Sequence, residues 1–281
     1  MPTHPIRFGI QTGQQDCTWE RMRDFWQKVD AWGYDSLWAF DHFYPIFVPD
    51  PHGPCMESWT LLGALSQHTK RARIGAMVNG NTYRNPALTA KMAATLDQIC
   101  GGRLNLGLGA GWFELEHKEY GIPFPTIGGR LSRLDETLTI IKSLFTAERT
   151  SFSGKHFKLQ DASFNPKPIQ QPHPTILIGA TGERVALGIV ARHAQMWNSF
   201  GTPEIFRDKI ARLEEHCQRI GRDPAEIEKS VLLNASFALD DARRQIDEYV
   251  AAGVTHIIFS LRPADRAWIR SFAERVIPSY R

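Results

Sequence analysis

The sequence predicts an α/β protein, a (β/α)8 TIM barrel with an insertion after the fourth β/α unit. Short apolar runs alternate with helical patterns eight times, and runs such as HIIF and TILI are nearly continuous in apolar residues. Strands that are buried on both faces have such apolar sequences, and alternating strands and helices of these lengths imply right-handed crossovers between parallel strands. The length of 281 residues suits a barrel of about 250 residues plus insertions. An open doubly wound sheet is the alternative, but eight regular units without a domain break favour one closed domain over residues 1–281.

The first half of the chain supplies four strand–helix pairs. Gly33 stops the first helix where a C-cap glycine is expected, and Pro86 suits the first position of the third helix. The loop between the second strand and its helix is rich in proline. The predicted strands cover residues 7–12, 37–40, 72–78 and 104–109, and the predicted helices cover residues 18–32, 57–69, 86–99 and 129–145.

The second half repeats the scheme after an irregular segment. Residues 148–174 are too polar and proline-rich for a helix and too long for a simple connection, so we expect an insertion that forms a small hairpin over one barrel end. The predicted strands that follow cover residues 175–179, 194–199, 230–236 and 256–261, and the predicted helices cover residues 183–192, 203–219, 240–251 and a last segment from Asp265.

Composition excludes several classes of function. A net charge of +3 with 42% apolar and 22% charged residues does not suggest disorder, a nucleic-acid surface or a polybasic membrane patch. The four cysteines form no CxxC pair and have no histidine at zinc-finger spacing, so we expect reduced thiols and no metal. No apolar stretch resembles a signal peptide or reaches the length of a membrane span. We therefore expect a cytoplasmic protein.

Asp41, His42 and Phe43 follow the predicted second strand directly, in DSLWAFDHFYP. The carboxyl ends of parallel barrel strands are where catalytic groups lie. An imidazole that titrates near neutrality can act there as a general acid or base. A structural or surface histidine is equally compatible with these residues alone.

Two glycine-bearing turns follow later strands. GLGAGW, residues 107–112, lets backbone N–H groups approach a planar or anionic ligand, but its spacing fails the dinucleotide fingerprint. GATGER, residues 179–184, leads into a helix whose free N–H groups suit a phosphate. The alternatives are a chain turn over the barrel rim for the first and a βα turn with Thr181 as N-cap for the second.

Other polar and aromatic residues allow two interpretations each. Arg84 could bind phosphate or hold its own loop, whereas Asp97 and Arg103 flank a tight turn and are expected to be structural. Four tryptophans near strand ends could pack in the core or form an apolar wall for a flat ligand. They are Trp38, Trp59, Trp112 and Trp197.

The order of these motifs resembles the luciferase-like monooxygenase family from about Phe8 to Asn198. The matching stretches are DSLWAFDHF, RIGAMVNGNTYRNPALTAKMAATLDQICGGRLNLGLGAGW, YGIPFP and ILIGATGER. The resemblance implies a TIM barrel that binds coenzyme F420 or, alternatively, reduced FMN at its C-terminal mouth. The DHF form is more similar to the F420-dependent branch, in which His42 would serve in proton transfer. A non-prolyl cis peptide is then expected within Met77 to Gly80.

The resemblance also assigns roles to individual residues. His42 and Asp41 would be catalytic, with Asp41 or a backbone group orienting the imidazole; Asp41 could instead contact the cofactor or satisfy a backbone turn. Ala180 stands where relatives often have glycine. Trp112 replaces a glutamate that acts as an acid in one F420-dependent branch, so that branch's sugar-phosphate chemistry is not assigned. The implied cofactor-binding residues are Val78, Asn79, Gly109, Ala110, Gly111, Trp112, Gly179, Ala180, Thr181 and Gly182.

The function implied by the resemblance is an F420-dependent oxidoreductase that transfers a hydride between the deazaflavin and a small organic substrate. The alternatives are an FMNH2-dependent two-component monooxygenase, supplied by a separate reductase, and a non-catalytic flavin-binding protein. A phosphosugar enzyme without a redox cofactor fits least. A homodimer is also expected. The substrate would contact the loops at residues 44–54 and 113–125 and the insertion.

Overall fold

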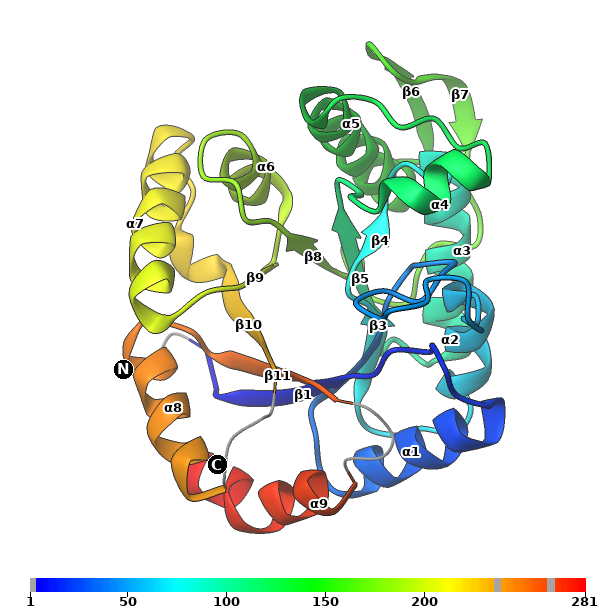
Figure 1. Ribbon diagram of the computed structural model, residues 1–281. Coiled ribbons are helices and arrows are strands. Elements are labelled where there is room, and N and C mark those ends of the chain that lie inside the picture. Colours follow the sequence, from blue (N-terminus) through cyan, green and yellow to red (C-terminus); the bar gives the residue numbers. More distant parts are fainter. Residues whose placement is uncertain (1–3, 235–238, 262–265) are drawn as a thin grey trace.

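The computed structural model describes residues 4–234, 239–261 and 266–281. Its main sheet is a ring of parallel strands with the helices outside it (Figure 1). The order of the sheet is β3-β2-β1-β11-β10-β9-β8-β5-β4. The strands are β1 (Arg7–Gln11), β2 (Ser36–Ala39), β3 (Arg73–Ala76), β4 (Asn79–Gly80), β5 (Asn105–Gly109), β8 (Thr175–Gly179), β9 (Met196–Ser199), β10 (Glu228–Asn234) and β11 (His256–Ser260).

The ring closes through the third barrel strand, which is divided into two parts. β3 pairs with β2, β4 pairs with β5, and a parallel bridge joins Ile74 to Leu104. Between β3 and β4 lies the Met77–Val78 peptide bond, which is cis. The nine strands thus occupy eight barrel positions, which confirms the predicted TIM barrel and the predicted place of the cis bond.

The helices on the outside of the barrel follow the predicted order; those at Pro86–Ile99 and Pro203–Arg219 have the predicted ends, and the ends of the others are shifted. α6 begins at Ala186, three residues after its predicted start, and α4 was not predicted. The predicted strand end at Ala235 and Ser236 and the predicted helix start at Asp265 lie outside the described residues. The helices are α1 (Trp19–Ala31), α2 (Ser58–Ser66), α3 (Pro86–Ile99), α4 (Glu114–Glu119), α5 (Ile127–Thr146), α6 (Ala186–His193), α7 (Pro203–Arg219), α8 (Leu239–Ala251) and α9 (Arg266–Arg275), with 3-10 turns at Pro224–Glu226 and Ile277–Tyr280.

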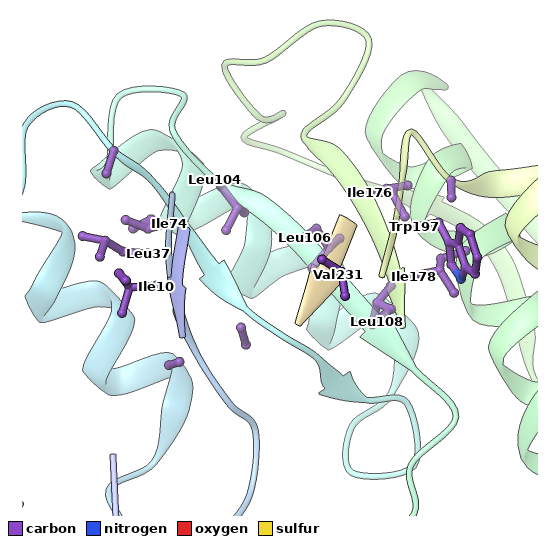
Figure 2. Packing of buried hydrophobic residues seen from close by; sticks show 14 of the residues in the cluster. Ile10, Leu37, Ile74, Leu104, Leu106, Leu108, Ile176, Ile178, Trp197 and Val231 are labelled. Carbon is purple, nitrogen blue, oxygen red and sulfur yellow. The ribbon is translucent and has the colours of Figure 1, made fainter. Parts of the chain in front are cut away.

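Two apolar clusters hold the barrel together, because neighbouring residues of a strand face opposite sides of the sheet. The larger cluster lies between the strands and the helices, and Figure 2 shows members such as Leu106, Ile176 and Ile178. The smaller cluster has the opposite strand parity and fills the barrel interior with Trp38 and Leu177, together with Met77, Met196 and Ile258. Within the described residues, no helix is long and apolar enough to span a membrane.

The insertion contains an antiparallel hairpin, β6 (Arg149–Ser153) and β7 (Lys158–Ser163). Glu136 of α5 accepts hydrogen bonds from three backbone N–H groups of the hairpin turn. Further along, Gln170 donates to the buried Asp97 from its backbone and its side chain, at 3.0 and 2.7 Å. The insertion is therefore tied to the side of the barrel, along α5 and α3.

Asp97 and Arg103 both have structural roles, as expected, but they act separately. Arg103 donates to the carbonyl oxygens of Ser66 and Thr69 at 2.8 and 3.0 Å, near the end of α2. Carbonyl groups at a helix end lack partners within the helix. Arg103 thus caps α2, and Asp97 holds the insertion.

Candidate active site

His42 lies just beyond the carboxyl end of β2, which stops at Ala39, and is bound by a residue far away in the sequence. Its Nδ1 atom is 2.7 Å from Oε1 of Glu116, which belongs to α4. His42 is 8% exposed and Glu116 is fully buried. Among the described residues, Nε2 of His42 has no hydrogen-bond partner, so this nitrogen is free to exchange a proton with a ligand.

The Glu116 carboxylate is surrounded by donors. The backbone N–H of Phe43 donates to Oε2 at 2.8 Å, and the hydroxyl of Tyr83 donates to Oε1. Burial alone would raise the pKa of Glu116, but the hydrogen bond and charge of His42 and these two donors lower that pKa below its ordinary value. Burial and the bond to Glu116 raise the pKa of Tyr83. Glu116 is therefore ionised near neutrality and fixes the orientation of the imidazole.

Sequence reasoning missed Glu116 because residues 113–125 were expected to form a loop. The spacing of Phe113, Glu116, His117 and Tyr120 is i, i+3, i+4, i+7, which places all four on one face of a helix. Glu116 and His117 are the buried residues of α4. A carboxylate on the buried face of this helical spacing would have been the signal.

Of the roles considered for Asp41, the structure does not support orientation of His42, because Glu116 holds the imidazole and Asp41 binds elsewhere. Its carboxylate accepts two hydrogen bonds from Arg84, at 2.7 and 3.0 Å, and one from the Gly80 N–H at 3.2 Å. Arg84 also donates to Glu57, the N-cap residue of α2, at 3.0 Å. Burial raises the pKa of Asp41, and the Arg84 guanidinium opposes this shift. Arg84 thus holds its own loop, the second of the two roles considered for it.

Val78 lies against glycines at the ends of two neighbouring strands. A Cβ atom added to Gly109 would lie 2.6 Å from a methyl group of Val78, and one added to Gly179 would lie 3.1 Å from both methyl groups. The Cβ atom added to Gly109 would also lie 3.8 Å from the Gly179 carbonyl oxygen. The structure thus brings Val78, Gly109 and Gly179 together in one surface, where the Val78 side chain fills the space that side chains on the two glycines would need.

Two buried asparagines next to this surface have unused acceptors. Asn79 donates its side-chain N–H to the Gly107 carbonyl at 2.7 Å, and Asn81 donates to the Gly109 carbonyl at 2.9 Å. Within the described residues, Oδ1 of each side chain has no partner, although each residue is only 3% exposed. Buried polar atoms are normally hydrogen-bonded. These oxygens could accept hydrogen bonds from a bound ligand.

The turn from Gly179 to Gly182 joins β8 to α6. Ala180 is buried and is fixed to β9 by two hydrogen bonds. Its backbone N–H donates to the Asn198 carbonyl at 3.0 Å, and its carbonyl oxygen accepts from the Trp197 ring N–H at 2.9 Å. Thr181 and Gly182 are exposed. Thr181 is not the N-cap: that residue is Val185, whose side chain makes no capping bond. The first N–H groups of α6 are therefore without a side-chain cap.

The four tryptophans do not form a common wall, so that interpretation is wrong. Trp38 and Trp197 are fully buried, and Trp59 is 7% exposed. Trp112 is 51% exposed, and its ring centroid lies 5.3 Å from that of His42. Only Trp112 of the four lies open beside the imidazole, in the segment Ala110–Trp112 that turns at Gly111 with φ +80°.

Comparisons with known proteins identify the family of this chain. The model of the luciferase-like monooxygenase family matches residues 3–276. The chain is 30% identical over 242 residues to the F420-dependent glucose-6-phosphate dehydrogenase of Microbacterium testaceum, a match that covers 85% of this chain and 70% of that protein.

Solved structures share the fold at lower sequence identity. An F420-dependent secondary alcohol dehydrogenase in complex with an F420–acetone adduct superposes with a TM-score of 0.87 at 20% identity, over 99% of this chain and 100% of that one. The F420-dependent tetrahydromethanopterin reductase from Methanopyrus kandleri gives a TM-score of 0.85 at 19% identity, with the same coverage.

Proposed function

The chain belongs to the luciferase-like monooxygenase family, and from this premise we propose that it is an F420-dependent oxidoreductase that transfers a hydride between the deazaflavin and a small organic substrate. The observation that carries the proposal is the buried His42–Glu116 pair, at 2.7 Å, at the strand ends that also hold the glycine surface under Val78. Among the relatives, the dehydrogenase of Microbacterium testaceum is F420-dependent, which supports the choice of cofactor.

The residues of the site fit this cofactor. The flat ring would lie against Val78, whose side chain is held between the strand ends by packing against Gly109 and Gly179. Oδ1 of Asn79 and of Asn81 can accept hydrogen bonds from polar N–H groups of the ring. The uncapped N-terminus of α6 suits the phosphate of the cofactor's tail. When bound, F420 supplies C5 of its deazaflavin, a carbon that donates or accepts a hydride.

His42 would move the proton that accompanies the hydride. Glu116 holds Nδ1, so Nε2 is the ring nitrogen that would accept a proton from the substrate or return one. Tyr83 and the Phe43 N–H keep the carboxylate in place. Asp41 contributes indirectly in this scheme, because with Arg84 it fixes the backbone just before His42.

Titration of the purified protein with F420 and with FMN tests the cofactor. We expect F420 to bind with a Kd on the order of 10 μM or lower and FMN to bind more weakly. Tighter binding of FMN, with turnover that depends on oxygen, would identify a two-component monooxygenase and its need for a separate reductase. Binding of F420 without turnover of any compound would indicate a cofactor-binding protein, and binding of neither rejects the proposal.

Replacing Glu116 by glutamine is expected to lower kcat by about 10- to 100-fold while the Kd for F420 stays within about threefold. The substitution keeps the shape of the side chain but removes the charge that holds the imidazole. Glu114→Gln is the matched control, because Glu114 is exposed on the same helix, and it should keep full activity. Equal effects of the two substitutions would exclude Glu116 as the positioning residue.

A further inference from the structure

The mouth beside His42 carries a pair of exposed aromatic rings. The rings of Phe47 and Trp112 stack with centroids 5.6 Å apart and an interplanar angle of 14°. Phe47 is 89% exposed and Trp112 is 51% exposed. The Trp112 ring also contacts His42, edge to face at 5.3 Å. We propose that this aromatic pair binds an uncharged substrate with a flat apolar ring and places it next to His42; the inference rests on the proposed function and names its substrate class.

The backbone holds Phe47 in this position. Both backbone groups of Ile46, the residue before it, are bound by the Gln15 side chain: the carbonyl accepts at 3.0 Å and the N–H donates at 2.9 Å. Phe47 has φ +55°, a conformation that is uncommon for a bulky residue and persists where the surroundings fix it. With its backbone fixed in this way and its ring stacked on Trp112, Phe47 needs little reordering when a ligand binds.

Two arginine side chains of the loops near the site are already engaged. Arg84 is bound to Asp41 and Glu57. Arg130, which reaches the Trp112 segment, donates to the carbonyl oxygens of Gly111 and Pro125 and stacks on the Phe124 ring. Recognition of a phosphate or carboxylate requires free cationic or N–H donors, and both of these guanidinium groups are committed elsewhere. Aromatic faces, in contrast, bind apolar rings by dispersion and burial.

Calorimetric titration with acetophenone and with glucose 6-phosphate, in the presence of F420, tests the inference. We expect acetophenone to bind and glucose 6-phosphate to bind at least about tenfold more weakly. Phe47→Ala and Trp112→Ala should each weaken acetophenone binding by about 5- to 10-fold. Leu88→Ala removes another exposed apolar side chain, on α3, and should leave acetophenone binding unchanged.

Other results would overturn the inference and leave the proposed function intact. The aromatic subsite would be rejected if glucose 6-phosphate bound more tightly than acetophenone, or if a protein that binds F420 did not bind acetophenone. It would also be rejected if the variants of Phe47 and Trp112 bound acetophenone as the unmodified protein does. The Kd for F420, measured on the same preparations, separates these results from a failure of the cofactor assignment.

Discussion

Replacing His42 by glutamine is expected to lower turnover by about 10²- to 10⁴-fold, with F420 binding changed by less than about threefold. Glutamine cannot exchange a proton as imidazole does, but its amide can still donate to the buried Glu116. Alanine would leave that carboxylate without one of its donors, at a cost of about 1–3 kcal/mol in folding free energy. The measurement is steady-state kinetics of F420 reduction or oxidation, alongside cofactor titration.

His68→Gln is the control for this experiment. His68 is exposed, near the end of α2 and close to the Trp19 ring, so its replacement should leave turnover within about twofold of the unmodified protein. A His42→Gln protein that retains most of its activity would show that another group moves the proton. Loss of cofactor binding in that variant would assign His42 to binding instead.

Replacing Arg84 by methionine is expected to lower the free energy of unfolding by about 3–5 kcal/mol. The Asp41 side chain is 1% exposed and the Arg84 side chain 12%, and their closest contact is 2.7 Å. Removal of the guanidinium leaves a buried carboxylate with the Gly80 N–H as its remaining hydrogen-bond donor among the described residues. Urea denaturation measures the change. Asp41→Asn combined with Arg84→Met should recover part of the loss, because the buried charge is then absent as well.

The decrease in the free energy of unfolding caused by Arg84→Met should depend on pH. Burial already raises the pKa of Asp41 above 3.8, and loss of the cation raises the folded-state pKa further. A raised folded-state pKa means that the folded protein binds the proton more tightly, so stability falls as pH rises from 3.8 to the folded-state value. The loss should therefore be larger at about pH 8 than at about pH 5.

Arg212→Met serves as the control for the ion pair. The Arg212–Glu215 contact of 3.0 Å joins side chains that are 58% and 45% exposed, and such surface pairs contribute little. The free energy of unfolding should change by less than about 0.5 kcal/mol at either pH. A similar loss for both arginine variants would mean that burial of Asp41 is not what makes Arg84 important.

The elements that were predicted well are those with a strong local pattern. The helix at Pro203–Arg219 and the strand at Thr175–Gly179 have the predicted ends, because Pro203 starts one and a continuous apolar run forms the other. α4 was missed because it has six residues, too few for an apolar period to stand out. The start of α6 was misplaced because GATGER contains no side chain that caps the helix.

The sequence by itself determined the order of strands and helices, the barrel that they form, and the presence of His42 at a strand end, since these follow from local apolar patterns and from motif order. Only the tertiary structure decided the partners of the site. Glu116 binds His42, although the two residues are 74 positions apart in the sequence. Asp41 pairs with Arg84 and not with the imidazole, and the ring of Phe47 stacks on that of Trp112. Such contacts depend on how loops from different strands converge at the barrel mouth, and no local pattern specifies that convergence.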